Sequence, residues 1–142
     1  MSIDYITGRK RSDLYGVFLK HKPSKQAHNY LPAYARHFEP VRHDVRKVLE
    51  IGVEAGTSLR MWADYFPRAE IYGMDLNPRC KELETDRIRI VIGDQSNPAD
   101  LAQLPTDLDI IIDDGSHVPD HQINTFKHLF RHHMPERGIY AI

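Results

Sequence analysis

A short apolar strand that runs through a glycine-containing turn into a helix constrains the fold of this chain more than any other feature. The segment extends from Val48 to Ser58. Its turn presents unpaired backbone N–H groups at a helix N-terminus, where a polar or anionic group can bind. A dinucleotide-binding fingerprint would need glycines at 52, 54 and 57, but Glu54 and Thr57 occupy the last two positions. The turn therefore indicates either a ligand site of another kind or a plain strand-to-helix connection in an α/β protein.

Apolar and amphipathic segments alternate regularly after residue 46. Strands are predicted at 47–51, 70–74, 88–92, 108–112 and 138–142. Helices are predicted at 59–66, 99–104 and 123–130, and one more precedes them at about 31–38. This alternation predicts an α/β fold with a Rossmann-like, mostly parallel sheet and helices on both faces. We expect a single domain with an N-terminal helical or lid segment, 1–46, and a ligand-binding core, 47–142.

Composition excludes several classes of protein. The net charge of −1 over 142 residues gives no electrostatic case for a nucleic acid partner. Because no apolar run reaches membrane-spanning length and the N-terminus lacks the apolar core of a signal peptide, no membrane partner is expected. The one cysteine, Cys80, excludes an internal disulfide, so a cytoplasmic location is expected.

Acidic residues end four successive predicted strands. They are Glu50, Asp75, Asp94 and the pair Asp113–Asp114. Ligands of such sheets lie beyond the carboxyl ends of the strands. Asp75 could accept hydrogen bonds from both hydroxyls of a ribose, and Asp94 with its neighbour Gln95 could read an adenine edge. Helix N-capping is the alternative for Asp75 and Asp94, and it is our interpretation of Asn97 and Asp120.

Two adjacent carboxylates, Asp113 and Asp114, repel each other at the end of a buried strand and need positive charge nearby. A sulfonium cofactor and a divalent cation could supply it, and carboxylates favour Mg²⁺ over Zn²⁺. His117 lies three residues further on and is a candidate general base. The alternative is a capping aspartate with a surface histidine.

The other histidines receive plainer interpretations. His117 and His121 have the spacing of a metal-binding pair, but Pro119 lies between them. Three further histidines lie among basic residues on one predicted helix, which we interpret as a solvated face: His128, His132 and His133, with Lys127 and Arg131.

Taken together, the glycine turn, the acidic strand ends and the run from Ile111 to His117 resemble class I S-adenosylmethionine (SAM) dependent methyltransferases. They resemble in particular the sugar O-methyltransferases of macrolide antibiotic pathways and the related cephalosporin hydroxylase-like proteins. Flanking segments agree, namely 28–30, 38–40, 59–62, 65–67, 71–73 and 121–122. The resemblance covers roughly residues 25 to 142, and the Asp-Asp-Gly-Ser-His run is its most specific part.

The resemblance implies a role for each matching residue. The methionine part of SAM would be bordered by Glu50, Gly52, Gly56 and Ser58. Asp75 would hold the ribose, Asp94 and Gln95 the adenine side, and Asp113 would face the methionine end. Asp114 would be a Mg²⁺ ligand, and His117 would be the base that takes a proton from a sugar hydroxyl.

The chain departs from the family in two places. Before His28, only Lys25 fits the loop of Gly-Ser-Asp-Lys-Gly type that covers the cofactor in the family. An acidic pair after strand five and two final strands, which complete the metal site and the sheet in the family, do not occur before Ile142. We therefore expect a truncated or naturally short chain with an incomplete Mg²⁺ site. We also expect a homo-oligomer formed at the apolar edge strand 138–142.

The leading hypothesis is a Mg²⁺-assisted O-methyltransferase that acts on a sugar or polyketide hydroxyl of a small natural product such as an antibiotic. A SAM-binding remnant without methyl transfer activity is the second hypothesis. A nicotinamide-dependent oxidoreductase is the third, and it is disfavoured because Glu54 and Thr57 replace glycines.

Overall fold

A parallel sheet forms the centre of the molecule. The computed structural model describes residues 13–23 and 27–142, and in these residues the sheet has five strands in the order β3-β2-β1-β4-β5. The strands are β1 (Lys47–Ile51), β2 (Glu70–Asp75), β3 (Ile88–Ile92), β4 (Ile110–Asp113) and β5 (Ile139–Ala141). Each was predicted to within two residues of its ends. The strand order reverses between β1 and β4, which is where such sheets bind ligands.

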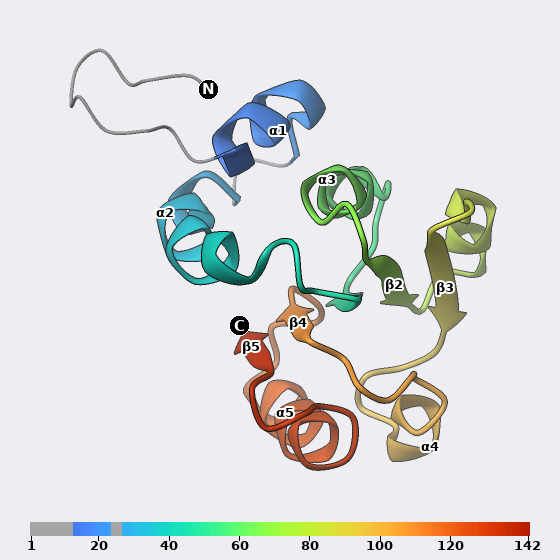
Figure 1. Ribbon diagram of the computed structural model, residues 1–142. Coiled ribbons are helices and arrows are strands. Elements are labelled where there is room, and N and C mark those ends of the chain that lie inside the picture. Colours follow the sequence, from blue (N-terminus) through green and yellow to red (C-terminus); the bar gives the residue numbers. More distant parts are fainter. Residues whose placement is uncertain (1–12, 24–26) are drawn as a thin grey trace.

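Helices cover both faces of the sheet, as predicted (Figure 1). One face carries α1 (Asp13–His21), α2 (Ala27–Phe38) and α3 (Thr57–Tyr65). The other carries α4 (Pro98–Leu101) and α5 (Pro119–His132). Two 3₁₀ helices, η1 (Glu39–Val41) and η2 (Pro78–Leu83), complete the described elements. The fold is thus the predicted Rossmann-like α/β fold.

Alternating strand residues build a separate apolar core on each face. Val48 packs with α1, α2 and α3 in one buried cluster, while its neighbour Leu49 packs with α4 and α5 residues in the other. Ile110 and Ile111 of β4 divide in the same way. Successive side chains of a strand point to opposite faces, so a strand buried on both faces is apolar throughout.

The described part of the N-terminal segment shares the first core cluster with the rest of the molecule. Leu14, Phe18 and Phe38 are buried against Trp62 of α3. At the surface, His21 Nε2 lies 2.8 Å from Asp64 Oδ2, which ties the end of α1 to α3. The loop around Lys25, from which a cofactor lid was considered, lies outside the described residues. Among the described residues, no helix is long and apolar enough to span a membrane.

Candidate functional site

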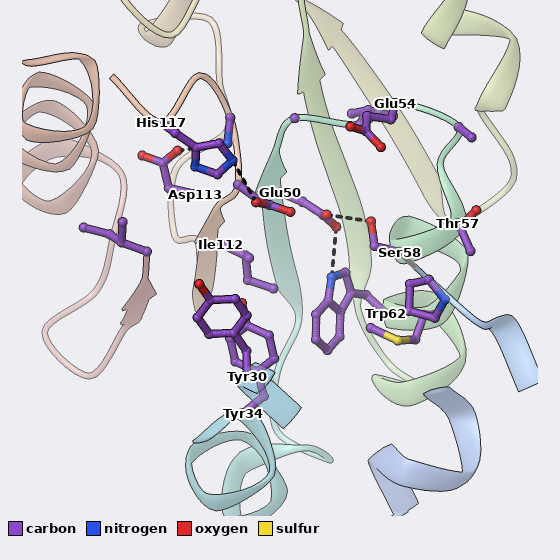
Figure 2. A pocket seen from close by; sticks show the side chains of 18 of the residues that line it. Tyr30, Tyr34, Glu50, Glu54, Thr57, Ser58, Trp62, Ile112, Asp113 and His117 are labelled. Carbon is purple, nitrogen blue, oxygen red and sulfur yellow. Dashed lines mark hydrogen bonds and ion pairs between the residues drawn. The ribbon is translucent and has the colours of Figure 1, made fainter. Parts of the chain in front are cut away.

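A cavity of about 900 Å³ opens beyond the carboxyl ends of β1 and β4, at the point where the strand order reverses. The glycine turn after β1 forms one wall, the loop after β4 a second, and two tyrosines of α2 a third (Figure 2). The predicted site residues that line it are Glu50, Gly52, Ser58, Asp113, Asp114 and His117. The fold therefore brings most of the candidate residues to one place.

Glycine is required at the turn because the two walls touch there. Gly52 has a φ of +88°, and its N–H donates to Met74 O at 2.9 Å. A Cβ atom at this position would lie 2.3 Å from the backbone oxygen of Asp114. Gly56, with a φ of +71°, is the N-cap of α3. Both glycines adopt left-handed conformations that other residues rarely tolerate.

Glu50 is a buried carboxyl group at the floor of the cavity. Its side chain accepts a hydrogen bond from Ser58 Oγ at 2.6 Å and another from Trp62 Nε1 at 2.9 Å (Figure 2). Burial raises the pKa of Glu50 to about 8, because desolvation outweighs the two hydrogen bonds that favour the ionised form. The group is thus mainly protonated at neutral pH.

Asp113 is buried and held by three donors from different elements. Gln95 Nε2 donates to Oδ1 at 3.2 Å, Gly115 N donates to the same oxygen at 3.4 Å, and Tyr140 Oη donates to Oδ2 at 3.1 Å. Amide and hydroxyl dipoles of the protein thus surround this carboxylate. Compensation of its charge by a bound cation stays a prediction.

Asp114 and His117 form the most exposed part of the site. His117 Nε2 lies 3.4 Å from Asp114 Oδ1, and both side chains are at least half exposed. Partial burial and the nearby Glu54 and Asp113 raise the pKa of Asp114, although His117 opposes the shift. His117 has a φ of +56°, a strained conformation of the kind often found at functional positions.

Asp75, Asp94 and Gln95 do not line this cavity. Asp75 Oδ2 accepts from Val53 N at 2.8 Å and from Glu54 N at 3.2 Å, so its carboxylate braces the glycine turn. Partial burial raises the pKa of Asp75, but these backbone donors and that of Asn77 outweigh it and hold the pKa below its ordinary value.

Asp94 and Gln95, in the loop after β3, also bind protein groups. Asp94 Oδ1 accepts from Ser96 N at 2.8 Å, and the Ser96 side-chain and backbone donors lower the pKa of Asp94. Gln95 is buried, and its Oε1 accepts from Ser116 N at 2.7 Å. Gln95 therefore joins the loops that follow β3 and β4.

The capping interpretation is right for one residue and wrong for another. Asn97 is the N-cap of α4 and accepts from Ala99 N. Asp120 is not a cap, because α5 begins at Pro119 with Val118 as its N-cap, which places Asp120 in the first turn.

The described residues contain no group of three or more His, Cys, Asp or Glu side chains that could hold a metal ion. Asp114 offers one carboxylate to the cavity. A Mg²⁺ ion, which takes six oxygen ligands, would need further ligands from water, substrate or residues outside the described part.

Aromatic contributions to the site were missed in the sequence. Trp62 and Tyr140 donate to the buried carboxyl groups Glu50 and Asp113. Tyr30 and Tyr34 also line the cavity. A buried Trp or Tyr needs a partner for its polar atom, and the acidic strand ends were the available acceptors. That requirement is the signal that could have found them.

Comparisons with known proteins agree with this geometry. The chain is 40% identical to 8-demethyl-8-alpha-L-rhamnosyl tetracenomycin-C 2'-O-methyltransferase of Streptomyces olivaceus, over 95% of this chain and 38% of that protein. It is 41% identical to demethylmacrocin O-methyltransferase of Streptomyces fradiae, over 81% of this chain and 31% of that protein. The chain thus spans about a third of the length of these relatives. No protein-family model matches it.

Solved structures give the same result. The chain superposes with a TM-score of 0.82 and 36% identity on the MycE methyltransferase from the mycinamycin biosynthetic pathway, solved in complex with Mg, SAH and mycinamycin VI. The match covers 94% of this chain and 37% of MycE. A short-chain dehydrogenase/reductase of Veillonella parvula has a TM-score of 0.53 at 15% identity, which reflects the shared fold alone.

The fold of this chain matches that of a solved methyltransferase that binds SAH. Its homologues are the sugar O-methyltransferases of macrolides and tetracenomycins, which it matches over part of their length.

Proposed function

We propose that this chain forms the cofactor-binding and base-bearing part of a SAM-dependent sugar O-methyltransferase. One observation carries the proposal: the cavity that joins the glycine turn to Asp114 and His117 lies within the segment shared with MycE, a structure that contains SAH. The acceptor would be a hydroxyl of a sugar or polyketide, since the homologues are named for such substrates.

The cofactor would lie along the carboxyl ends of the strands. Glu50, Gly52, Gly56 and Ser58 would border its methionine part, and Asp113 would face that end. Asp75 would hold the ribose through lone pairs that its backbone hydrogen bonds leave open, since Oδ2 accepts from Val53 N and Glu54 N and Oδ1 accepts from Asn77 N. Asp94 would serve the adenine side. Gln95 would act there by holding the β3 and β4 loops together, because its side-chain amide is already hydrogen-bonded within the protein.

The reaction would be an in-line displacement. The acceptor hydroxyl oxygen forms a bond to the methyl carbon of SAM, the carbon–sulfur bond breaks, and its electron pair stays on the sulfur of S-adenosylhomocysteine (SAH). His117 takes the hydroxyl proton, and Asp114, 3.4 Å away, stabilises the resulting imidazolium. Holding oxygen and carbon in contact supplies much of the rate acceleration.

Asp114 is the residue of this chain that we propose as a Mg²⁺ ligand. When bound, such an ion would acidify the acceptor hydroxyl and orient it. The proton transfer above is assigned to His117 and Asp114, which the structure describes.

Calorimetric titration with SAH tests the proposal. We expect saturable binding of SAH and none of NADH, since Glu54 and Thr57 replace the glycines of a dinucleotide fingerprint. Binding of NADH instead would favour the oxidoreductase. Transfer of a labelled methyl group from SAM to mycinamicin VI would separate an active enzyme from a SAM-binding remnant, which would bind SAH without turnover. The proposal also includes a homo-oligomer and a cytoplasmic location.

A further inference from the structure

A second hollow, of about 400 Å³, lies between α4 and α5. It shares no lining residue with the cavity described above. Its lining residues come from α5, from α4 and from the loop after β3: Gln95, Ser96, Pro98, Leu101, Asn124, Lys127, His128, Arg131 and His132. The solvated helix face expected from the sequence therefore borders a concave surface.

Basic side chains dominate this hollow. Lys127, His128, Arg131 and His132 all line it, and no carboxylate does. Within the part of the chain that the structure describes, Lys127 and Arg131 form no side-chain hydrogen bond or ion pair. Two permanent positive charges are therefore left without a described partner on an open, concave surface.

Histidine rings lie beside these two charges. The rings of His128 and His132 lie 5.5 Å apart between centroids, and the same distance separates His128 from His133. Burial, together with His133 and His132, lowers the pKa of His128. A bound anion would reverse this shift, because it would favour the protonated ring.

The shape and charge select the class of ligand. Arg presents a planar fork of donors that fits phosphate oxygens, and Lys is a common phosphate partner. A volume of about 400 Å³ exceeds that of a lone phosphate, and Pro98 and Leu101 offer an apolar surface to the rest of the ligand. A long nucleic acid is disfavoured, because the site is a bounded hollow and the chain's net charge is −1.

We propose that the hollow between α4 and α5 binds a phosphate-bearing small molecule, held by Lys127 and Arg131 with His128 and His132 beside them. The Asn124 amide would donate a further hydrogen bond from α5. This site would be separate from the cavity that would bind SAM, so its test does not depend on methyl transfer.

Calorimetry with inorganic pyrophosphate and with ADP, at about 150 mM salt to screen weak surface attraction, tests the proposal. The Lys127→Ala/Arg131→Ala double variant should weaken binding of both probes at least about tenfold, as expected for losing two charge-assisted bonds. The matched control is Lys22→Ala/Arg89→Ala, which removes two exposed charges elsewhere and should leave binding unchanged. A melting temperature and SAH affinity close to those of the wild type would show that the first double variant is folded.

NMR of the imidazole protons gives a second readout. Pyrophosphate should raise the pKa of His128 in the wild type and leave it unchanged in the Lys127→Ala/Arg131→Ala variant. Absence of saturable binding of either probe, or equal affinity in that variant, would overturn the proposal. Tighter binding of a single-stranded RNA oligonucleotide, lost in the same variant, would overturn it in favour of a nucleic acid partner.

Discussion

At the scale of single residues, Glu50 is a titratable side chain that lies buried in the protein. The residue is 3% exposed, and among the described residues its carboxyl receives two hydrogen bonds, both from uncharged donors. Burial without a cation favours the neutral form, which is why its pKa lies near 8. The stability of the protein should therefore depend on the charge of this residue.

We predict that the free energy of unfolding falls as the pH rises from about 4.5 to about 8. Over this range the unfolded chain releases the Glu50 proton while the folded chain keeps it, since the pKa is raised from 4.5 to about 8. One such group changes the free energy of unfolding by at most about 1.4 kcal/mol per pH unit. Urea unfolding across this range should show the decline in the wild type and a smaller decline in Glu50→Gln. The exposed Glu82→Gln should retain the wild-type slope, and identical slopes in all three proteins would contradict the prediction.

Asp75 is predicted to matter for cofactor binding. Asp75→Ala removes the acceptor of Val53 N and Glu54 N and the proposed partner of the ribose. SAH affinity measured by calorimetry should fall by about 1.5–3 kcal/mol, the value of a hydrogen bond to a charged group. Asp86→Ala, an exposed aspartate away from the turn, is the control and should bind SAH normally. Unchanged affinity in Asp75→Ala would remove this residue from the ribose role.

His117 is predicted to affect turnover and not cofactor binding. In any form of the protein that transfers methyl groups, His117→Ala should lower kcat roughly 10²–10⁴-fold, the usual contribution of a general base. SAH affinity should change little, because His117 lies on the β4 wall and makes its ion pair with Asp114. The more remote His43→Ala should keep full activity. Equal losses of kcat and of SAH affinity would indicate a structural role.

The sequence located the acidic residues of the site but not the hydrogen bonds that they accept. Glu50, Asp75 and Asp113 were visible as polar residues at the ends of apolar strands. Their donors come from residues up to 27 positions away, as Tyr140 does for Asp113, and such pairings depend on the packed sheet. Gln95 was assigned to the adenine side because of its place after β3, whereas its side chain points to Asp113 and Ser116.

At the scale of elements, the turns after β1 and β4 are in close contact. Gly52 approaches the backbone of Asp114, and a Cβ on Gly115 would lie 2.0 Å from Gln95 Oε1. The backbone of the loop after β4 therefore lies directly against the glycine turn and against the side chain of Gln95. This contact fixes the distance between the two walls of the cavity that the glycine turn and the loop after β4 form.

Gly52→Ala is predicted to destabilise the protein by about 2 kcal/mol or more, because a Cβ would collide with Asp114 O and alanine resists a φ of +88°. SAH binding should be lost with it. Gly16→Ala is the matched control, since that glycine lies in α1 with open space around it. This substitution should raise the free energy of unfolding by about 0.5–1 kcal/mol. Denaturant unfolding measures both changes, and equal stability of Gly52→Ala and wild type would contradict the close contact.

Elements with a clear apolar period were predictable, and short ones were not. Every strand of the described sheet contains Ile or Val, and β3 and β4 are the richest in them, as is typical of buried parallel strands. The 3₁₀ helix η2 was missed, because its stability comes from the Asn77 cap and the burial of Cys80 and not from a repeating pattern. Helix α4 is shorter than predicted and ends at Leu101. Leu104, which was included in the predicted helix, is buried beyond the end of the helix.

At the scale of the whole molecule, the two faces of the sheet differ in cover. The face with α1, α2 and α3 holds the larger apolar cluster. On the other face, α5 leaves three apolar side chains partly exposed beside β5, an edge of the described sheet: Ile123, Phe126 and Phe130. Phe126 stacks on Phe130 and meets the edge of Tyr140, so these rings form one continuous patch.

We predict that this patch mediates self-association, because exposed apolar patches bind other chains. Sedimentation velocity should show a dimer or larger oligomer. The Phe126→Ser/Phe130→Ser variant should shift the association equilibrium toward the monomer. Leu19→Ser removes an equally exposed apolar side chain from α1 and should have no effect. A wild-type monomer at high concentration would contradict the prediction.

Gln95 lies between the larger cavity and the hollow formed by α4 and α5. It lines the hollow between α4 and α5, and its amide holds Asp113 and the backbone of Ser116 in the walls of the larger cavity. Any ligand that moves this side chain therefore acts on both sites, and linkage requires that the effect be reciprocal. If pyrophosphate changes SAH affinity by some factor, SAH must change pyrophosphate affinity by the same factor. One amide would thus make the two binding equilibria a single thermodynamic system, and two titrations in opposite order would measure their coupling.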